Sequence, residues 1–163
     1  MDKKLLKAIN EQIKNELYSA YLYLSMAAYS ESINLPGFAH WMKAQAGEEQ
    51  EHAMKLFGFL IDKGERVVLQ ALDKPPADFG SAKGIFEETL KHENKVTALI
   101  DRLYELAVDV GDNAASIFLQ WFVTEQVEEE KNATEILEQL KVVKADSPAL
   151  LMLDNVLAKR AAD

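Results

Sequence analysis

The most constraining feature of this sequence is an apolar stripe in residues 36–62 that a carboxylate and an imidazole interrupt. Glu49 and His52 are three residues apart, so on a helix both side chains leave the same face, one turn apart. The other members of that face follow in steps of four and three and are Phe38, Met42, Gln45, Leu56 and Phe59. A helix turns such a face toward its partners in a bundle. Because a buried, unpaired carboxylate is costly, the rest of the chain must supply neighbours for Glu49.

Four long stretches have helical periodicity and are separated by turn residues. We predict long helices at about 2–33, 36–62, 81–110 and 113–143, with Asp2 and Ser81 as N-caps. The connection from Glu65 to Gly80 is long, and Pro75 and Pro76 prevent a helix there. Such a connection can run the length of a bundle, so we expect the second and third long helices to be parallel.

These elements predict an all-α fold in one domain over residues 1–163. The four-helix bundle occupies about 2–143, with the long crossover between its second and third helices. A short fifth helix, C-terminal to the bundle, is predicted at about 148–159, with Ser147 as N-cap and Pro148 at its first position. It is apolar and cannot stand alone.

Each of the other long helices also has an acid on its apolar stripe. Counted from the turns that join the helices, these acids lie within about one helical turn of the level of Glu49 and His52. The predicted site consists of Glu16, Glu49, His52, Glu93 and Glu129, with Gln126 one turn from Glu129. Tyr23 lies two turns beyond Glu16, either as a core tyrosine bonded to a carboxylate or in a redox role.

Four carboxylates in a dry core repel one another strongly unless cations are present, and two divalent cations would balance them. The chain has no cysteine, which excludes disulfides, thiolate zinc and iron–sulfur clusters. Oxygen-rich ligation with one imidazole suits Fe(II) or Mn(II) and accepts Zn(II). We predict iron, because two irons bridged by a carboxylate can each give one electron to O2, and carboxylates also stabilise the Fe(III) that results.

The net charge and the distribution of apolar residues limit which binding partners and which cellular compartment we expect. The net charge of −9 argues against binding to nucleic-acid phosphates. Charged residues interrupt the apolar runs well before the roughly 18 residues that a membrane span needs. The stretch from Met1 to Lys7 lacks the apolar core of a signal peptide. We therefore expect a cytoplasmic protein with neither a nucleic-acid nor a membrane partner.

The chain resembles the ferritins, and specifically the bacterial and archaeal non-haem ferritins, over essentially its whole length. The matching segments are ELYSAYLY at 16–23, EEQEH at 48–52, WFVTEQVEEE at 121–130 and the short terminal helix. The resemblance implies an iron-storage protein with ferroxidase activity, which oxidises Fe(II) with O2 or peroxide at a dinuclear iron centre. It also implies a hollow shell of 24 identical subunits that stores ferric oxyhydroxide.

The resemblance also assigns roles to particular residues. One iron would be held by Glu16, Glu49 and His52, and the other by Glu49, Glu93 and Glu129, with Glu49 as the bridge. A third iron nearby would fall to Glu48, Glu125, Glu128 and Glu129, although a solvated acidic helix face also explains the run at 128–130.

Two departures separate the chain from the bacterioferritins. Where bacterioferritins have a second Glu-x-x-His motif, this chain has Gln126 and Glu129. Where they have the haem-binding methionine, it has Gln50, so we predict no haem. We hypothesise that ligation dominated by carboxylates lets Fe(III) leave, so that iron is a substrate passing through. His40 and His92 lack a comparable position on a stripe and are interpreted as ordinary helix residues.

Two other functions compete with iron storage. A di-iron oxidoreductase acting on an organic substrate would need a pocket over the site, but the large residues Phe86, Phe122 and Tyr23 leave no obvious vacancy. A purely structural bundle would need basic partners for its buried acids, and no stripe has a basic residue near them.

Overall fold

The computed structural model describes residues 1–161 and consists of five α-helices over that range, without a strand there. The helices are α1 (Lys3–Ser32), α2 (Pro36–Asp62), α3 (Ala82–Asp109), α4 (Asn113–Val142) and α5 (Pro148–Leu157). The predicted all-α fold is confirmed, and the ends of the helices agree with the prediction to within two residues. No helix in the described range is both long and apolar enough to cross a membrane.

Local side-chain contacts explain where the long helices begin. Asp2 accepts hydrogen bonds from the backbone N–H groups of Lys4 and Leu5, and Ser81 accepts one from Gly84. Asp112 caps α4 in the same way. These caps satisfy N–H groups that have no partner within the helix. Ser147 precedes α5 as predicted, but its side chain makes no capping bond and donates instead to the carbonyl of Lys144.

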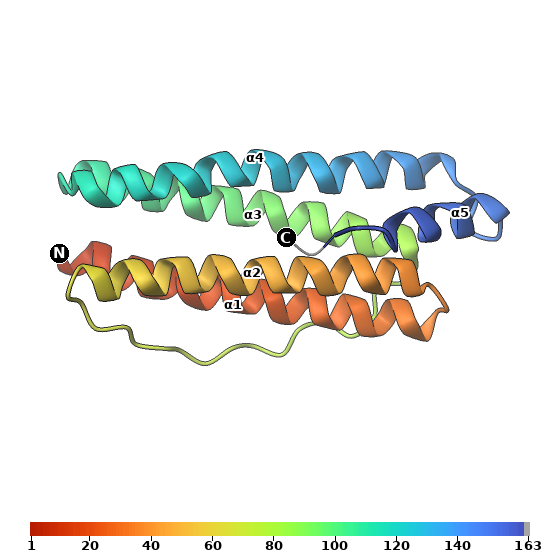
Figure 1. Ribbon diagram of the computed structural model, residues 1–163, viewed down its shortest axis with the longest axis horizontal. Coiled ribbons are helices and arrows are strands. Elements are labelled where there is room, and N and C mark those ends of the chain that lie inside the picture. The colour runs from red at the N-terminus through yellow and green to blue at the C-terminus, as the bar shows by residue number, and fades with distance from the viewer. Residues whose placement is uncertain (162–163) are drawn as a thin grey trace.

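The four long helices form two antiparallel hairpins, α1 with α2 and α3 with α4 (Figure 1). The extended segment 65–80 runs along the bundle and returns the chain to the end where α2 began, so α2 and α3 are parallel as predicted (Figure 1). Side chains of α1 hold this segment: Asn10 accepts from the Val68 N–H at 2.7 Å, and Ser25 donates to the carbonyl of Pro76.

The core consists of two apolar clusters with a polar layer between them. One cluster surrounds Phe38 and Phe86, toward the end of the bundle where α5 packs. The other surrounds Ile9 and Leu119 at the opposite end. Between them every long helix presents buried polar side chains, among them Glu16, Glu49, His52, Glu93 and Glu129. The fold thus places the predicted site residues at the middle of the bundle.

The predicted stripes are correct near the site and less accurate toward the helix ends. Phe59, predicted to face inward, is only half-buried, and the neighbouring Leu60 is fully buried instead. The reason is geometric, because a straight helix drifts by about 20° per heptad from a strict seven-residue repeat.

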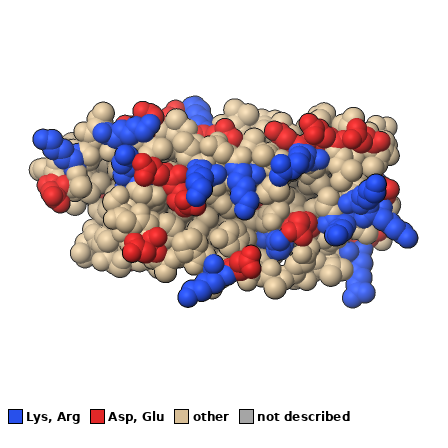
Figure 2. All heavy atoms as spheres, turned by 180° about the vertical axis from the view of Figure 1, so that it is seen from behind, with Lys and Arg blue, Asp and Glu red and all other residues tan. Residues whose placement is uncertain are grey.

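Helix α5 packs closely against the start of α2. The Asp154 carboxylate accepts a hydrogen bond from the Phe38 N–H at 3.0 Å. A Cβ atom at Gly37 would lie 1.8 Å from the Asp154 carbonyl oxygen, so only glycine permits this approach. On the face opposite that of Figure 1, acidic and basic side chains are interspersed along the bundle (Figure 2).

Candidate metal centre

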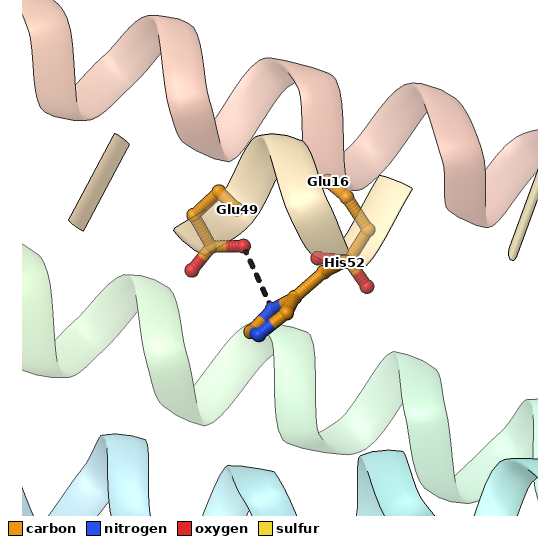
Figure 3. A group of neighbouring side chains, drawn as sticks. All are labelled: Glu16, Glu49 and His52. Atoms are coloured by element: carbon orange, nitrogen blue, oxygen red, sulfur yellow. Dashed lines mark ion pairs between the residues drawn. The ribbon is translucent and has the colours of Figure 1, made fainter. Parts of the chain in front are cut away.

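Glu16 of α1 and Glu49 and His52 of α2 form the first group of potential metal ligands. One donor atom from each side chain lies within 4.8 Å of the others (Figure 3). All three residues are buried, and His52 Nδ1 lies 3.6 Å from Glu49 Oε2. Helical spacing aligns the two α2 side chains, and the antiparallel hairpin brings Glu16 to their level.

A second group shares the imidazole. Donor atoms of His52, Glu125 and Glu129 also lie within 4.8 Å of one another. Glu125 is only half-buried, whereas Glu129 is buried. The sequence placed Glu125 only at a third iron position, yet here it lies beside the imidazole and Glu129.

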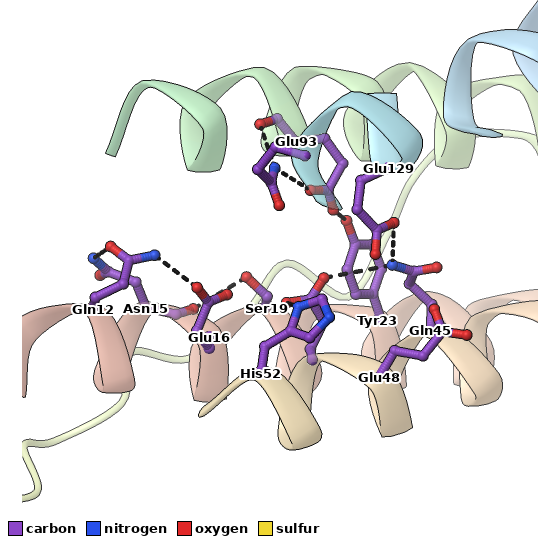
Figure 4. A network of polar contacts seen from close by, with 12 residues as sticks. Gln12, Asn15, Glu16, Ser19, Tyr23, Gln45, Glu48, His52, Glu93 and Glu129 are labelled. Atoms are coloured by element: carbon purple, nitrogen blue, oxygen red, sulfur yellow. Dashed lines mark hydrogen bonds and ion pairs between the residues drawn. The ribbon is translucent and has the colours of Figure 1, made fainter. Parts of the chain in front are cut away.

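Glu93 is buried at the same level but belongs to neither group within the described residues. Its two oxygens accept hydrogen bonds from the Tyr23 hydroxyl and from Gln126 Nε2, the latter at 3.2 Å (Figure 4). Gln126 Nε2 also contacts Thr97 Oγ1 at 3.2 Å. Since an amide N–H group is a hydrogen-bond donor and not a metal ligand, Gln126 in this orientation holds Glu93 in place.

Two oxygens of the first group have no hydrogen-bond partner. Glu16 Oε2 and Glu49 Oε2 are fully buried and accept no hydrogen bond within the described part of the chain. Buried acceptors nearly always have a donor, and the exceptions require an explanation. A cation bound between Glu16 and Glu49 would satisfy both oxygens, and the neighbouring imidazole would complete its ligands.

Burial and mutual repulsion set the charge of the acids. Burial raises the pKa of Glu16 to about 7. Burial, and then the charge of Glu93, raises the pKa of Glu129 to about 8. The pKa of Glu49 is raised well above its ordinary value by burial and by the carboxylates of Glu93, Glu16 and Glu129. Without a cation these groups hold protons near neutral pH, and a divalent ion would displace them.

The imidazole is electrically neutral over the same pH range. Burial, and to a smaller extent the charge of Lys55, lowers the pKa of His52 to about 4. A neutral imidazole has a free lone pair on one ring nitrogen, which is the form that binds metals.

Two glutamines contact the buried acids, although no role was predicted for either of them (Figure 4). Gln12 Nε2 donates to Glu16 at 2.8 Å. Gln45 Nε2 donates to Glu129 at 2.7 Å and lies 3.5 Å from Glu49. Each glutamine precedes an acid of its own helix by four residues, a spacing that places the two side chains on one face. The four-residue spacing is therefore the feature of the sequence from which both contacts could have been predicted.

The remaining histidines lie outside both ligand groups. His92, predicted to be an ordinary helix residue, is in fact buried, with Nε2 2.8 Å from the Ser19 hydroxyl and its ring edge-on to Tyr23. His40 is exposed, and its Nε2 lies 2.8 Å from the carbonyl oxygen of Arg160.

An acidic pocket of about 390 Å³ opens beside His52. Five glutamates and two basic residues are among its lining side chains, namely Glu48, Glu51, Glu125, Glu128, Glu129, Lys55 and Arg160. Lys55 lies over the ring of Trp121, 3.9 Å from its centroid. The three residues predicted with less certainty, Glu48, Glu125 and Glu128, thus share one surface depression next to the buried acids.

Known proteins are similar to this chain over almost its whole length. The bacterial non-heme ferritin of Bacteroides fragilis is 39% identical over 160 residues, which cover 98% of this chain and 99% of that protein. The bacterial non-heme ferritin of Staphylococcus saprophyticus is 36% identical over 163 residues, covering 100% of this chain and 98% of that protein.

Solved structures are similar over the same range. An engineered closed form of the Archaeoglobus fulgidus ferritin has a TM-score of 0.98 and 47% identity, covering 100% of this chain and 99% of that one. The open-pore ferritin of the same archaeon has a TM-score of 0.97 and 47% identity, covering 99% of each chain. A family model for the ferritin-like domain matches residues 6–143. From the bundle, its central acids and these matches together, the chain belongs to the ferritin family.

Proposed function

We propose that this protein stores iron and oxidises Fe(II) to Fe(III) at a dinuclear site in the middle of the bundle. The observation that supports this most directly is the buried group of Glu16, Glu49 and His52, in which two carboxylate oxygens have no hydrogen-bond donor. The iron-storage assignment also follows from membership of the ferritin family.

Iron is the substrate in this proposal. Two Fe(II) ions give one electron each to O2, which takes up two protons and becomes hydrogen peroxide; peroxide can serve as the oxidant in turn. Hard carboxylate oxygens stabilise the Fe(III) produced, and the neutral imidazole of His52 supplies a nitrogen ligand without adding charge. The few nitrogen ligands favour release of Fe(III) toward storage.

The ligands divide between two cations. Glu16, Glu49 and His52 hold the first. Glu49 interacts electrostatically with Glu93 and Glu129 as well as with Glu16, which suits a bridging carboxylate. The second cation takes Glu49, Glu93 and Glu129, and Glu93 turns from Tyr23 and Gln126 to reach it. A third iron would be held in the acidic pocket by Glu48, Glu125, Glu128 and Glu129.

Storage requires an assembly, and we propose a hollow shell of 24 copies in the cytoplasm. Large apolar side chains remain exposed on an isolated subunit, which suits burial between copies. They lie on all five helices and on the crossover, and include Tyr21, Leu24, Val68, Leu69, Leu151, Met152 and Val156.

Aerobic titration of the purified apoprotein with Fe(II) tests the function. Absorbance reports oxidation while a sizing column reports particle mass. We expect fast oxidation of about two irons per subunit, followed by further iron retained in a large soluble particle. A small particle that saturates at two irons would contradict storage and favour an oxidoreductase acting on another substrate.

Two variants test the site itself. Glu49→Ala and His52→Ala should each slow the fast phase of oxidation without changing the particle mass, because each removes a ligand and no contact between subunits. Glu105→Gln on the exposed side of α3 is the control. Fast oxidation at the wild-type rate in both site variants would rule out the assigned centre.

A further inference from the structure

The chain after α5 turns back toward the middle of the bundle and brings Arg160 to the acidic pocket (Figure 1). The guanidinium lies over the ring of Trp41, 4.3 Å from its centroid, and forms an ion pair with Glu48. Its backbone is held as well, because His40 Nε2 lies 2.8 Å from the Arg160 carbonyl oxygen. The side chain is only 16% exposed, so this is an anchored residue.

Arg160 also contacts the amide that faces the buried acids. Its Nη1 donates to Gln45 Oε1 at 2.8 Å, and Gln45 Nε2 donates to Glu129 at 2.7 Å. Gln45 Nε2 also lies 3.5 Å from Glu49 Oε1. Gln45 is therefore a bridge between the C-terminal segment and two acids of the metal centre.

The chemistry of the neighbours allows the amide only one orientation. A guanidinium has N–H donors and no acceptor, so the Gln45 oxygen must face Arg160. The Gln45 nitrogen then faces Glu129 and Glu49, whose oxygens accept from it. A reversed amide would put an oxygen against two carboxylates and an N–H group against a cation. Arg160 supplies the hydrogen bond that holds the Gln45 oxygen on the pocket side.

We propose that Arg160 is a positioning residue of the metal centre: by fixing the Gln45 amide, it holds Glu129 and Glu49 in the orientation that receives a divalent cation. The inference rests on the proposed function, since it concerns the same metal centre. It makes the segment that follows α5 a part of that centre, although the segment contributes no ligand.

A purely electrostatic role for Arg160 predicts the opposite result. Five glutamates line the pocket, and a guanidinium among them offsets their charge and competes with an incoming cation. If that were its main effect, removing Arg160 would strengthen binding of divalent metal. Positioning through Gln45 instead predicts weaker binding, so the sign of the change separates the two roles.

Anaerobic binding of Co(II), which does not require oxidation, is the appropriate measurement. Calorimetry and the visible Co(II) spectrum would compare the assembled apoproteins of wild type, Arg160→Ala, Gln45→Leu and the double variant. We expect Arg160→Ala to bind about three- to tenfold more weakly, the range for loss of one supporting hydrogen bond. In the Gln45→Leu background, the same change should have little further effect, because the bridge is already absent.

Two further variants serve as controls, one for the charge of Arg160 and one for the loss of an arginine side chain elsewhere. Arg160→Lys keeps the charge but loses the planar fork that bonds Gln45 and Glu48 together, so it should bind Co(II) more weakly than wild type. Arg102→Ala removes the same side chain from an exposed position on α3 and should bind as wild type does. Circular dichroism and a sizing column confirm that each variant is folded and assembled; if Arg160→Ala does not fold, Arg160→Lys provides the test.

The outcomes are distinguishable. Unchanged or tighter Co(II) binding by Arg160→Ala would overturn the positioning role, as would a full additional loss in the Gln45→Leu background. Wild-type binding by Arg160→Lys would show that the planar guanidinium fork is not required and would also overturn it. Failure of the wild-type protein to bind Co(II) would instead contradict the metal centre and the proposed function.

Discussion

The hydroxyl of Tyr23 on α1 donates a hydrogen bond to Glu93 on α3 and joins the two hairpins at the level of the candidate metal centre (Figure 4). Burial, and then the charge of Glu93, raises the pKa of Tyr23 well above its ordinary value, so the phenol remains a donor. Gln126 donates to the other oxygen of Glu93 at 3.2 Å. Glu93 is therefore held from two sides.

Replacing Tyr23 with phenylalanine should lower the stability of the apoprotein. The change leaves one oxygen of buried Glu93 without a donor, at a cost of about 1–3 kcal/mol. Thermal denaturation should show a lower Tm without metal and a smaller difference with Zn(II), because the cation satisfies the same oxygen. Equal Tm values for the two apoproteins would contradict this. A tenfold slower iron oxidation with unchanged Co(II) binding would assign Tyr23 a redox role instead.

Glu49→Gln should stabilise the apoprotein and at the same time weaken metal binding. Burial raises the pKa of Glu49 well above its ordinary value of 4.5. Keeping such a carboxyl protonated at neutral pH costs about 3 kcal/mol, and glutamine avoids that cost. We expect a higher Tm for the metal-free variant and a smaller rise in Tm on adding Zn(II). Glu105→Gln is the exposed control, and a lower Tm for apo Glu49→Gln would refute the expectation.

The stability of the apoprotein should fall as the pH rises from 6.5 to 8. Burial raises the pKa of Glu16 to about 7 and of Glu129 to about 8, whereas glutamate ordinarily ionises near 4.5. The folded state therefore binds more protons than the unfolded chain, and the stabilisation present below pH 4.5 is lost as the pH approaches 8. The slope is on the order of 1 kcal/mol per pH unit for each carboxyl that titrates.

The buried histidines act in the opposite direction, but at lower pH. Burial lowers the pKa values of His52 and His92 to about 4 from 6.5, so their effect on stability fades as the pH rises above 6.5. Calorimetry of the apoprotein at pH 6.5, 7 and 8 would therefore measure a carboxyl effect that dominates increasingly toward pH 8. The metal-loaded protein should lack the fall in Tm, since a cation replaces the protons. A Tm of the apoprotein that rises over this range would contradict the assigned burial.

Gly37→Ala should displace α5 from α2. The new Cβ would lie 1.8 Å from the Asp154 carbonyl oxygen, so the helices must separate and the bond from Phe38 N–H to Asp154 is lost. We expect a loss of about 1–3 kcal/mol and a changed particle mass on a sizing column. Gly47→Ala, on the same helix with nothing within 4 Å, should instead stabilise by about 0.5–1 kcal/mol. Equal behaviour of the two variants would show that α5 is not tightly docked.

The helices and the level of the acids could be predicted because both depend on local information. Pro36 begins α2 and Asp62 ends it as expected, and Ser81 caps α3. Rise per residue then fixes how far each acid lies from its turn, which is why Glu16 and Glu49 meet.

Contacts between distant segments could not be predicted in the same way. Arg160 reaches Gln45 across 115 residues, by a short return of the chain after α5 that no periodicity indicates. Glu93 was expected beside Glu129 as a ligand, but its rotamer follows its bonds to Tyr23 and Gln126. Which of several neighbours a side chain bonds depends on the packing between helices, and not on the position of the residue along its own helix.

The crossover between α2 and α3 gives the bundle an approximate two-fold symmetry. Because it returns the chain to its starting end, α3 runs opposite to α1 and α4 opposite to α2, so a half-turn about an axis across the bundle exchanges the hairpins (Figure 1). The pairs of positions related in this way are Glu16 with Glu93, Glu49 with Gln126, and His52 with Glu129. The two hairpins therefore have similar backbones but different side chains at the related positions. Two identical ions bound here would therefore meet unlike sets of ligands, because only one half has an imidazole.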